Sequence, residues 1–283
     1  MRLLGAVFLC TGLVNLVQGA LVDNFDKCNQ FFLARQPPTF DGQLTPDYRK
    51  DYRLICQTQN GRDYEYFTLY DTRMKIPLYS AYRFHKRLMD QIITRDAAWK
   101  IEPQYDIMSA IKFVYHIFQL DGSRLAYMSQ IRSSEIPVKD RGIHQAVNRD
   151  YHNSGYDKGH LYPVNHAYDQ KAADGTFTLT NAAPQNCMFN KEWYNKVERV
   201  VAQTLENCEH GFMYVVTGVI YSNNKLNNRV NVPSHYWTAY CCENKFSGGG
   251  VVGPPHARGI YTQPQPSFGE TFTGERRAEA ART

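Results

Sequence analysis

The chain has 283 residues, of which 43% are hydrophobic and 21% are charged. A chain of this length and composition can bury a substantial core, which excludes a disordered protein and favours one large domain, with or without appended segments. The net charge of +5 is mildly basic, so it favours polyanionic partners without requiring them.

The N-terminus has the pattern of a secretory signal peptide. Arg2 precedes an apolar run that ends in small residues at Gly19 and Ala20. The run is short for a membrane span, so cleavage near these two residues is favoured over a membrane anchor or a buried helix. We therefore assign residues 1–19 to a signal peptide, expect no membrane span in the mature chain, and predict a secreted, extracellular protein.

Cysteine usage points to the same compartment. Cys10 falls within the signal, and six cysteines remain: Cys28, Cys56, Cys187, Cys208, Cys241 and Cys242. An even number of cysteines in an exported chain predicts disulfide bonds, although the sequence leaves their pairing open. The adjacent Cys241 and Cys242 are expected to bond to different partners. The sequence has no C-x-x-C pair, so structural zinc is not expected.

The first elements after the signal are a helix and a hairpin. Residues 21–40 are predicted as a short helix that is stopped by a pair of prolines. Residues 64–70 and 76–82 are aromatic-rich strands, and the short turn between them predicts a hairpin. The stretch 90–145 stays open, because its apolar runs fit either a buried strand or a helix.

The clearest local unit lies between residues 176 and 206. Residues 176–180 alternate like a strand, residues 182–186 form a turn, and a helix runs from about Asn190 to Glu206. Apolar side chains fall on one face of this helix at helical spacing: Trp193, Val197, Val200, Val201 and Leu205.

The C-terminal part of the chain contains two more strands and a segment of different composition. The strands, residues 212–221 and 229–241, complete an α+β pattern. From Ser247 onward the chain is rich in glycine and proline and ends in charged residues. This segment has little to bury, so residues 246–283 are predicted to form a flexible low-complexity tail.

Phosphodiester hydrolysis needs a base that deprotonates water and a cation that neutralises the charge developing on the phosphate oxygens. Three residues of the sequence can supply these groups. His160 can accept a proton near neutral pH, and Asn190 offers a hard oxygen to magnesium, which takes few protein ligands. Glu198 follows about 12 Å further along the predicted helix. Taken singly, each is more often a solvated loop histidine, a helix cap or a surface glutamate.

Longer motifs around these residues resemble the DNA/RNA non-specific endonuclease family. The motifs keep the family's order and spacing: Asn148-Arg149-Asp150-Tyr151, Ser154-Gly155-Tyr156-Asp157-Lys158-Gly159-His160-Leu161, residues 176–185, Phe189-Asn190 and residues 193–198. The resemblance is strong in residues 145–200, covers most of residues 20–245 and is greatest for an exported branch of the family. It implies an α+β fold in which a ββα-metal finger, formed around residues 176–206, packs on a central antiparallel sheet.

The resemblance also implies a role for each site residue. His160 becomes the proton acceptor, and Asn190 becomes the direct ligand of Mg²⁺ or of another divalent cation such as Mn²⁺. Glu198 holds water that is bound to the metal, and Asn181 helps to shape the site. Lys158 completes the predicted catalytic set at a position where the family usually has arginine. Lysine keeps the charge but loses the planar two-pronged donor, which would reduce activity.

An upstream arginine that contacts phosphate in the family has three candidates here, Arg132, Arg141 and Arg149. DNA and RNA are the expected partners, bound mainly through backbone phosphates because no base-reading motif is present. We therefore predict a metal-dependent endonuclease in residues 20–245. The alternative is a secreted binding protein that retains the nuclease fold without catalysis. The sequence lacks G-x-S-x-G and H-E-x-x-H, which disfavours a serine hydrolase and a zinc protease.

Overall fold

The structure is a computed structural model of the chain. It describes residues 19–38, 51–58, 63–85, 93–95, 99–102, 127–128, 131–132, 142–208, 212–243, 248–254 and 261–263. Except for Gly19, the predicted signal peptide lies outside the described residues, and so do most of the open stretch 90–145 and the last twenty residues of the predicted tail.

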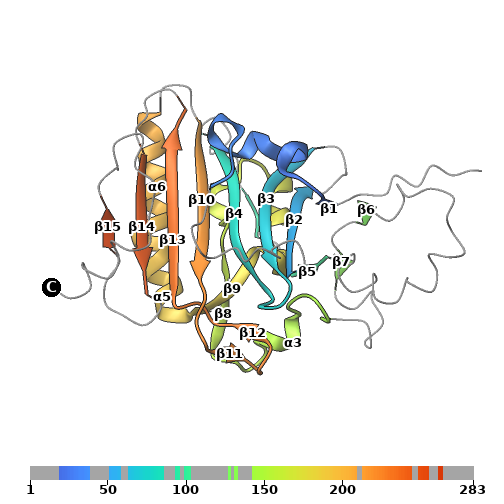
Figure 1. The fold of residues 1–283 in the computed structure, drawn as a ribbon. Coiled ribbons are helices and arrows are strands. Elements are labelled where there is room, and N and C mark those ends of the chain that lie inside the picture. The colour runs from blue at the N-terminus through green and yellow to red at the C-terminus, as the bar shows by residue number, and fades with distance from the viewer. Residues whose placement is uncertain are drawn as a thin grey trace, which may run out of the picture.

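A nine-stranded antiparallel sheet forms the centre of the described part of the chain (Figure 1). Its strands, in spatial order, are β15 (Tyr261–Gln263), β14 (Gly248–Gly253), β13 (His235–Cys242), β10 (Phe212–Ile220), β4 (Ile76–His85), β3 (Tyr64–Asp71), β2 (Tyr52–Thr58), β1 (Gly19–Val22) and β6 (Tyr127–Met128). Each neighbouring pair is antiparallel. The predicted α+β fold with a central antiparallel sheet is confirmed, and so is the predicted hairpin, which is β3 and β4.

Shorter elements surround this sheet. Among the residues that the structure describes, three strand pairs lie outside it: β5 (Lys100–Ile101) with β7 (Ile131–Arg132), β8 (Tyr156–His160) with β9 (Ala182–Asn186), and β11 (Lys225–Leu226) with β12 (Val230–Asn231). The α-helices are α3 (Asn148–Tyr151), α4 (Gln170–Thr176), α5 (Cys187–Trp193) and α6 (Arg199–Thr204). A π turn, η8 (Tyr194–Glu198), joins α5 to α6, and the 3₁₀ turns are η1 (Phe25–Phe31), η2 (Leu33–Arg35), η6 (Val164–His166), η7 (Leu179–Asn181) and η9 (Leu205–Asn207).

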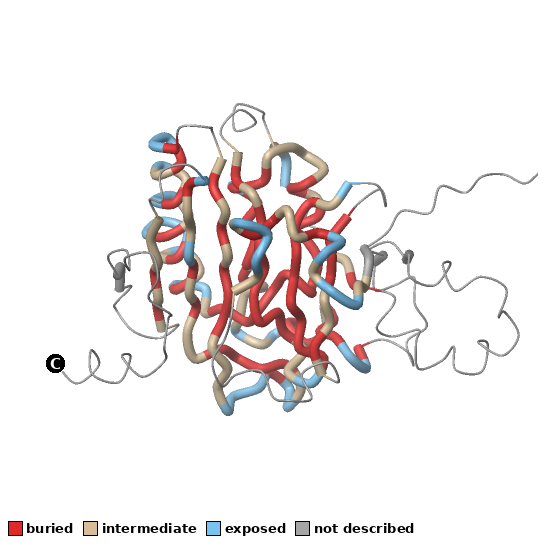
Figure 2. The backbone as a smooth tube through the Cα atoms, turned by 45° about the horizontal axis from the view of Figure 1, so that its top comes forward, coloured by how far each residue is buried: buried red, intermediate tan, exposed pale blue. Residues whose placement is uncertain are grey.

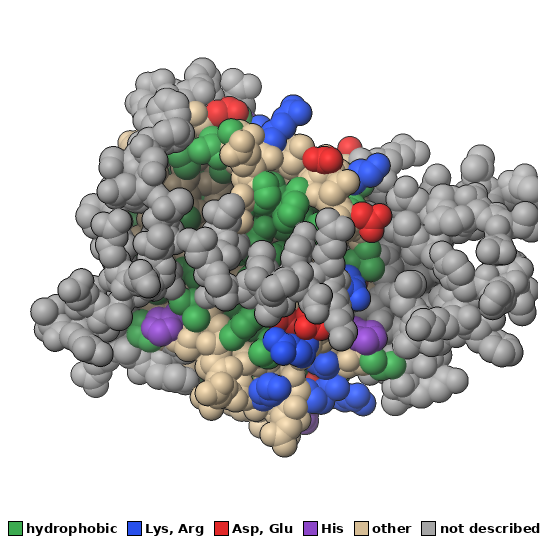
Figure 3. All heavy atoms as spheres, in the orientation of Figure 1, with side chains coloured by type: hydrophobic (Ala, Val, Ile, Leu, Met, Phe, Trp, Pro, Cys, Tyr) green, Lys and Arg blue, Asp and Glu red, His purple; other side chains and the backbone are tan. Residues whose placement is uncertain are grey.

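Side chains on both faces of the sheet are buried. Tyr66 and Tyr82 belong to the core cluster that contains the helix α5–α6, whereas their neighbours Phe67 and Ala81 pack in a second cluster with η1. Because successive strand residues point to opposite faces, a strand that is covered on both sides has a nearly continuous apolar sequence. Figure 2 shows that buried residues run through the middle strands of the sheet. In Figure 1, α5 and α6 lie behind β13 and β14. Figure 3 shows the molecule in the orientation of Figure 1. Hydrophobic side chains reach the surface over the middle of the sheet, and side chains of both charges lie along its lower edge.

The helix predicted for residues 21–40 is wrong in its first part. Leu21 pairs with Ile55 of β2, so the chain begins as a strand of the sheet before it turns into η1 and η2. Only short 3₁₀ turns follow, because Phe31 and Phe32 are both buried against the sheet. A disulfide bond between Cys28 and Cys56 fastens η1 to β2.

The strand predicted at residues 176–180 is also wrong. These residues end α4 and form η7, and the strand is β9, which occupies the five residues that were predicted as a turn. The threonines that create the alternating pattern are all buried rather than turned to solvent. Thr176 and Thr178 donate hydrogen bonds to the carbonyls of Ala173 and Gly175, three residues earlier, which favours a turn over a strand.

The helix of the finger begins three residues before its predicted start at Asn190. Asn186 caps α5, because its side-chain oxygen accepts hydrogen bonds from the backbone N–H groups of Met188 and Phe189. Val200, predicted on the buried face, is 42% exposed, whereas Phe189 is buried in its place. The other predicted apolar positions are buried in the core: Trp193, Val197, Val201 and Leu205.

Residues after Asn228 form two strands rather than the single strand predicted for residues 229–241. Val230 and Asn231 pair with β11, and β13 begins only at His235. Pro233 lies between the two strands and has no backbone N–H for a ladder hydrogen bond.

The glycine-rich segment at the start of the predicted tail is a strand of the sheet. Residues 248–253 form β14, which pairs with β13, so the prediction of a flexible tail from residue 246 is wrong for these residues. A Cβ atom on Gly249 would lie 2.5 Å from the hydroxyl oxygen of Tyr240. The missing side chain therefore leaves room for the tyrosine ring over the backbone of β14, which a composition-based prediction does not detect.

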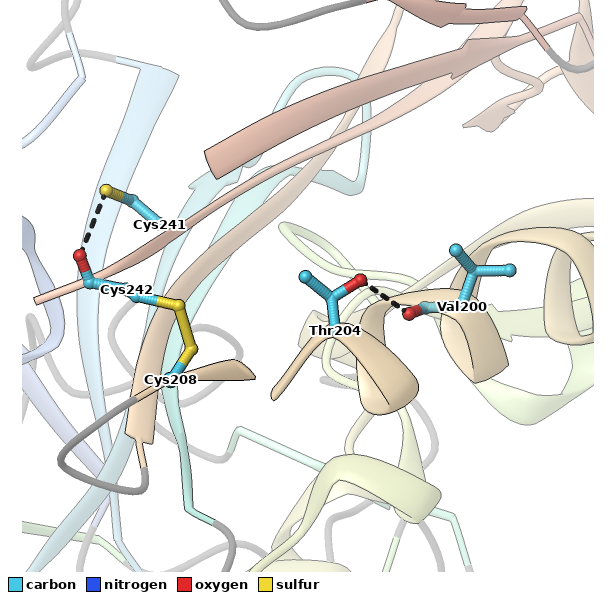
Figure 4. Close-up of a disulfide and its surroundings, with 5 residues drawn as sticks. All are labelled: Val200, Thr204, Cys208, Cys241 and Cys242. Atoms are coloured by element: carbon cyan, nitrogen blue, oxygen red, sulfur yellow. Dashed lines mark hydrogen bonds between the residues drawn. A yellow bond between two sulfur atoms is a disulfide. The ribbon is translucent and has the colours of Figure 1, made fainter. Parts of the chain in front are cut away.

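The other disulfide bond of the described chain joins Cys208 to Cys242, at the end of the finger helix and of β13 (Figure 4). Cys241 is not disulfide-bonded, and its thiol donates a hydrogen bond to the carbonyl of Cys242 at 3.4 Å. The expectation that Cys241 and Cys242 bond to different partners is therefore wrong for Cys241, because only Cys242 forms a disulfide bond. Cys187 is also free and lies exposed at the start of α5.

Candidate active site

One cleft of about 940 Å³ gathers most of the predicted site residues. Lys158, His160, Asn190 and Glu198 all line it, although 40 residues separate the first from the last in the chain. The other lining residues are Ile93, Arg95, Trp99, Tyr151, Tyr156, Asp157, Pro163, Val164, Asn165, Ala167, Phe177, Lys191, Tyr194 and Asn195. The cleft is thus built from β8, the helix of the finger and the segment around residues 93–99.

The pairing of β8 with β9 holds Lys158 and His160 at the wall of the cleft. Gly159, which lies between them, pairs with Ala183 and is buried. A Cβ atom on Gly159 would lie 2.7 Å from the Cβ atom of Gln185, so no larger residue fits here without displacing that side chain. The glycine is therefore required by close packing inside the finger rather than by a turn.

His160 is held between two aromatic rings. Its ring centroid lies 4.7 Å from that of Trp99 and 5.0 Å from that of Phe177, which it meets edge-on. Burial, assisted by the positive charge of Arg95, lowers the pKa of His160 to about 3, so the imidazole is neutral at physiological pH. Nε2 is buried and has no hydrogen-bond partner in the described part of the chain. Nδ1 is therefore the ring nitrogen that can accept a proton from water in the cleft.

Asn190 is oriented by a carboxylate of β8. Its Nδ2 atom donates a hydrogen bond to Oδ2 of Asp157 at 3.0 Å, which ties the first helical turn of α5 to the strand that ends in His160. Because the amide nitrogen is engaged in this way, Oδ1 is the atom that remains for a cation or for water. Asp157 thus helps to define the site, although the sequence did not single it out as a site residue.

Glu198 lies at the end of the π turn and faces the same cleft as Asn190. Burial raises the pKa of its carboxyl to about 8, and the nearby Arg95 opposes this shift. The Arg95 charge therefore acts on both His160 and Glu198, lowering the pKa of each.

Lys158 presents a second positive charge to the cleft. Its Nζ atom lies 5.5 Å from the ring centroid of Trp99 and 5.6 Å from that of Tyr151. Burial lowers the pKa of Lys158, and the neighbouring Asp157 partly offsets that effect. An ammonium group that contacts aromatic faces and is partly desolvated is well placed to bind an anion.

Asn181 is not part of the cleft lining. It is fully buried, and its Oδ1 atom accepts hydrogen bonds from Ser80 Oγ and from the backbone N–H of Tyr162. Its Nδ2 atom donates to the carbonyls of Tyr162 and Thr176. These four bonds use its hydrogen-bonding capacity, so Asn181 positions the chain just after His160 but does not touch a substrate.

The structure places a different arginine in the cleft from the three that the sequence suggested. Arg95 lines the cleft, whereas Arg149 is exposed on α3 and is not among the lining residues. Arg141 and the side chain of Arg132 lie outside the described residues. Neither Arg95 nor Trp99 could be selected from the sequence, because their segment has no helical or strand periodicity and contacts the site only through tertiary packing.

The donor atoms in the cleft suit a hard divalent cation that keeps most of its waters. No group of three His, Cys, Asp or Glu side chains that could hold a metal occurs within the described ranges, which argues against a closed protein cage there. The amide oxygen of Asn190, with the Asp157 and Glu198 carboxyl groups facing the same cleft, offers oxygen ligands only. Magnesium is typically bound by one or two protein oxygens with water in the other positions, so these residues fit it.

The strand–strand–helix finger on an antiparallel sheet, with a histidine and an asparagine that line one cleft, defines a ββα-metal nuclease fold. In agreement, the sequence profile of the DNA/RNA non-specific endonuclease family matches residues 52–274. The chain belongs to that family, whose members are generally metal-dependent nucleases. The match extends over β14 and β15, which agrees with their place in the sheet.

Similar proteins include the endonuclease domain-containing 1 proteins of human and mouse. The human protein is 33% identical over 253 residues, covering 87% of this chain and 45% of the relative. The mouse protein is 29% identical over 220 residues, covering 77% of this chain and 39% of the relative. Human mitochondrial endonuclease G is 33% identical over 166 residues, covering 53% of this chain and 50% of the relative. The chain thus spans about half the length, or less, of these relatives.

A solved structure of EndoG in complex with EndoGI is also similar to this chain. It has 21% sequence identity and a TM-score of 0.45, and the match covers 77% of this chain and 81% of that one. As to membranes, the described residues contain no helix that is both long and apolar enough to cross a bilayer.

Proposed function

We propose that this protein is a secreted, metal-dependent endonuclease that hydrolyses phosphodiester bonds of DNA and RNA with little sequence preference. The observation that carries the proposal is the convergence of His160, Asn190 and Glu198 on a single cleft that is also lined by three basic side chains, Arg95, Lys158 and Lys191. Each residue type commonly has a structural role when it occurs alone, but a neutral, partly buried histidine that shares a cleft with an oriented amide oxygen has the groups for this chemistry.

His160 is the general base. Its Nδ1 atom accepts a proton from a water molecule, whose oxygen attacks the phosphorus atom while the P–O bond to the leaving sugar oxygen breaks, and that oxygen takes up a proton from water in the cleft. The low pKa of the ring keeps the imidazole unprotonated before the reaction. The rings of Trp99 and Phe177 fix the orientation of the imidazole. A base with so low a pKa is weak, so its effect depends on holding water close to the phosphate.

Asn190 and Glu198 form the cation side of the site. Asn190 Oδ1 would be the direct protein ligand of Mg²⁺ or Mn²⁺. The positive charge of the ion would lower the pKa of Glu198 from its value of about 8, and the resulting carboxylate would accept hydrogen bonds from water beside the ion. The bound ion supplies a positive charge that stabilises the developing charge on the phosphate oxygens. Asp157 fixes which end of the Asn190 amide faces this position.

Arg95 and Lys158 bind the phosphate of the substrate. Both are positively charged and line the cleft, and contacts of this kind recognise the backbone without reading the bases. Little sequence preference follows from this, and binding should weaken as salt concentration rises. Arg95 can grip two phosphate oxygens at once, whereas Lys158 acts as a single point charge.

Export is supported by the leader-like residues 1–19 and by two disulfide bonds, which persist in oxidising compartments. The check is to express the full chain in animal cells and to determine the N-terminus of the protein in the medium. A new N-terminus near Ala20 is expected, and a protein that stays inside the cell with Met1 intact would contradict export.

The test of the activity is a nuclease assay on the purified chain with plasmid DNA and with RNA, run across a titration of Mg²⁺ and Mn²⁺ and with a chelator. His160→Ala and Asn190→Ala are expected to lower cleavage at least 100-fold. A matched variant of the exposed His152, His152→Ala, should cleave as the wild type does. Intact DNA and RNA at all metal concentrations, with retained salt-sensitive binding, would support the binding protein instead of the enzyme.

A further inference from the structure

The helix of the finger changes its winding within the site. The π turn Tyr194–Glu198 lies between α5 and α6 and is closed by a hydrogen bond from the backbone N–H of Arg199 to the carbonyl of Tyr194. Turns of this kind are rare, and they are frequent at functional sites. This one ends on Glu198, which lines the cleft.

The π turn changes the angle between Asn190 and Glu198 around the helix. In a regular α-helix each residue advances by about 100°, so two residues eight positions apart differ by about 80°. A π turn contains one additional residue, so the same eight positions behave like seven and the difference falls to about 20°. The altered winding thus brings the two side chains onto one face of the helix, toward the cleft that both of them line.

His166 contacts this turn from outside the helix. The side chain belongs to η6, is 1% exposed and is not among the residues that line the cleft. Its Nε2 atom lies 2.9 Å from the carbonyl oxygen of Glu198, and its Nδ1 atom lies 2.8 Å from the hydroxyl oxygen of Tyr82 in β4. The ring also stacks on Phe84, with centroids 4.3 Å apart.

The two partners of His166 determine where its protons lie. A carbonyl oxygen can only accept, so Nε2 carries the proton and donates to Glu198. Nδ1 is then the acceptor, and the Tyr82 hydroxyl donates to it. Burial lowers the pKa of His166 to about 4, which keeps the ring in this neutral form at physiological pH.

We propose that His166 is a positioning residue that holds the π turn against the sheet and thereby keeps the Glu198 carboxyl on the face of the helix that carries Asn190. The chain of contacts runs from Tyr82 in β4 through His166 to the backbone of Glu198. The inference rests on the proposed function, because Asn190 and Glu198 are the groups on the cation side of that site. Losing the contact should therefore weaken divalent-cation binding rather than substrate binding.

The test compares His166→Leu with His166→Gln in the full chain. Leucine removes both hydrogen bonds, whereas glutamine can still donate to the Glu198 carbonyl and accept from Tyr82. His166→Leu is expected to raise the Mg²⁺ concentration for half-maximal cleavage about tenfold and to leave the KM for DNA within twofold, as loss of a group behind a metal ligand typically does. His166→Gln should recover most of that loss, and His152→Gln, at an exposed histidine, should have no effect.

A second measurement does not depend on cleavage. Mn²⁺ binding, followed by electron paramagnetic resonance of the free ion, should weaken by the same factor in His166→Leu and recover in His166→Gln. Equal Mn²⁺ affinity in the wild type and in a folded His166→Leu would overturn the proposal, and so would a change in the KM for DNA alone. If the wild type binds Mn²⁺ but cuts neither DNA nor RNA, the proposed function fails while the binding comparison still decides the role of His166.

His166→Leu removes a buried polar side chain, so its folding is checked by thermal unfolding. If it does not fold, Tyr82→Phe takes its place, because this change removes only the hydroxyl that orients the His166 ring. A loss of Mn²⁺ affinity in the same direction supports the proposal. Unchanged affinity in a folded Tyr82→Phe protein would then count against it.

Discussion

Replacing Glu102 by glutamine should remove a large part of the pH dependence of stability. Glu102 is 2% exposed, and its Oε1 atom accepts hydrogen bonds from Gln57 Nε2 at 2.9 Å and from Thr180 Oγ1 at 3.4 Å. Burial raises the pKa of Glu102 to about 7, and the bonds from Gln57 and Thr180 oppose the shift. Glu102 lies three residues after Trp99, whose ring packs on His160, and its backbone N–H donates a hydrogen bond to Oε1 of Gln145.

The size of the expected change in stability follows from the shift in the pKa of Glu102. A carboxyl group with a raised pKa in the folded state binds a proton more tightly there than in the unfolded chain. Its contribution to stability is therefore fully present below the unfolded pKa and is lost as the pH rises through the folded value. From the ordinary value of 4.5 to about 7, the loss between pH 5 and pH 8 is about 2.5 kcal/mol.

The assay is urea unfolding at pH 5, 6.5 and 8, followed by tryptophan fluorescence. The wild type should lose about 2.5 kcal/mol more than Glu102→Gln over this range. His160 and His166 titrate in both proteins, so the comparison cancels their contribution, and Glu206→Gln, at an exposed glutamate, should follow the wild type. The reasoning is refuted if Glu102→Gln and the wild type lose the same free energy of unfolding between pH 5 and pH 8.

Three further predictions concern the finger, the cleft and the N-terminal disulfide. Gly159→Ala should displace Gln185, lower stability by about 1 to 3 kcal/mol and reduce cleavage, and an unchanged melting temperature would contradict the packing argument. Lys158→Arg should raise cleavage and lower the KM for DNA, because arginine binds phosphate with two donors, and an assay that shows lower activity would contradict this. Replacing Cys28 and Cys56 together by serine should cost about 3 to 4 kcal/mol in urea unfolding, since a loop of 28 residues is opened, whereas no loss of stability would show that the disulfide is dispensable.

The sequence was sufficient to predict the central strands and the residues that converge on the cleft. Strands β3 and β4 were visible because both are buried on two faces and therefore have continuous aromatic runs. His160, Asn190 and Glu198 could be predicted as site residues because the short motifs around them keep the order and spacing of the endonuclease family. The pattern of threonines before β9 was misleading, because all three side chains are buried. Thr176 and Thr178 bond to backbone carbonyls three residues earlier, and Thr180 donates to the carboxyl group of Glu102.

Other parts of the site depend on contacts that local patterns do not encode. Arg95 reaches the cleft only because its segment packs beside Trp99 and His160. The sequence does contain a pattern that the π turn explains. Buried residues recur at every fourth position of the finger helix: Phe189, Trp193, Val197, Val201 and Leu205. Such a repeat exceeds the ~3.6 residues of an α-helical turn, so it fits a helix that is locally widened. The prediction treated the helix as regular and placed Val200 inward.

The four hydrogen bonds of Asn181 have a consequence for protein engineering. They link the loop after His160 to Ser80, which precedes Asn181 by 101 residues, and Tyr82 of the same strand reaches the finger through His166. Transplanting the strand–strand–helix unit alone into another scaffold would leave these partners behind. A graft that is meant to cut nucleic acid should therefore bring β4 with it, as a piece of the catalytic module and not merely as part of its support.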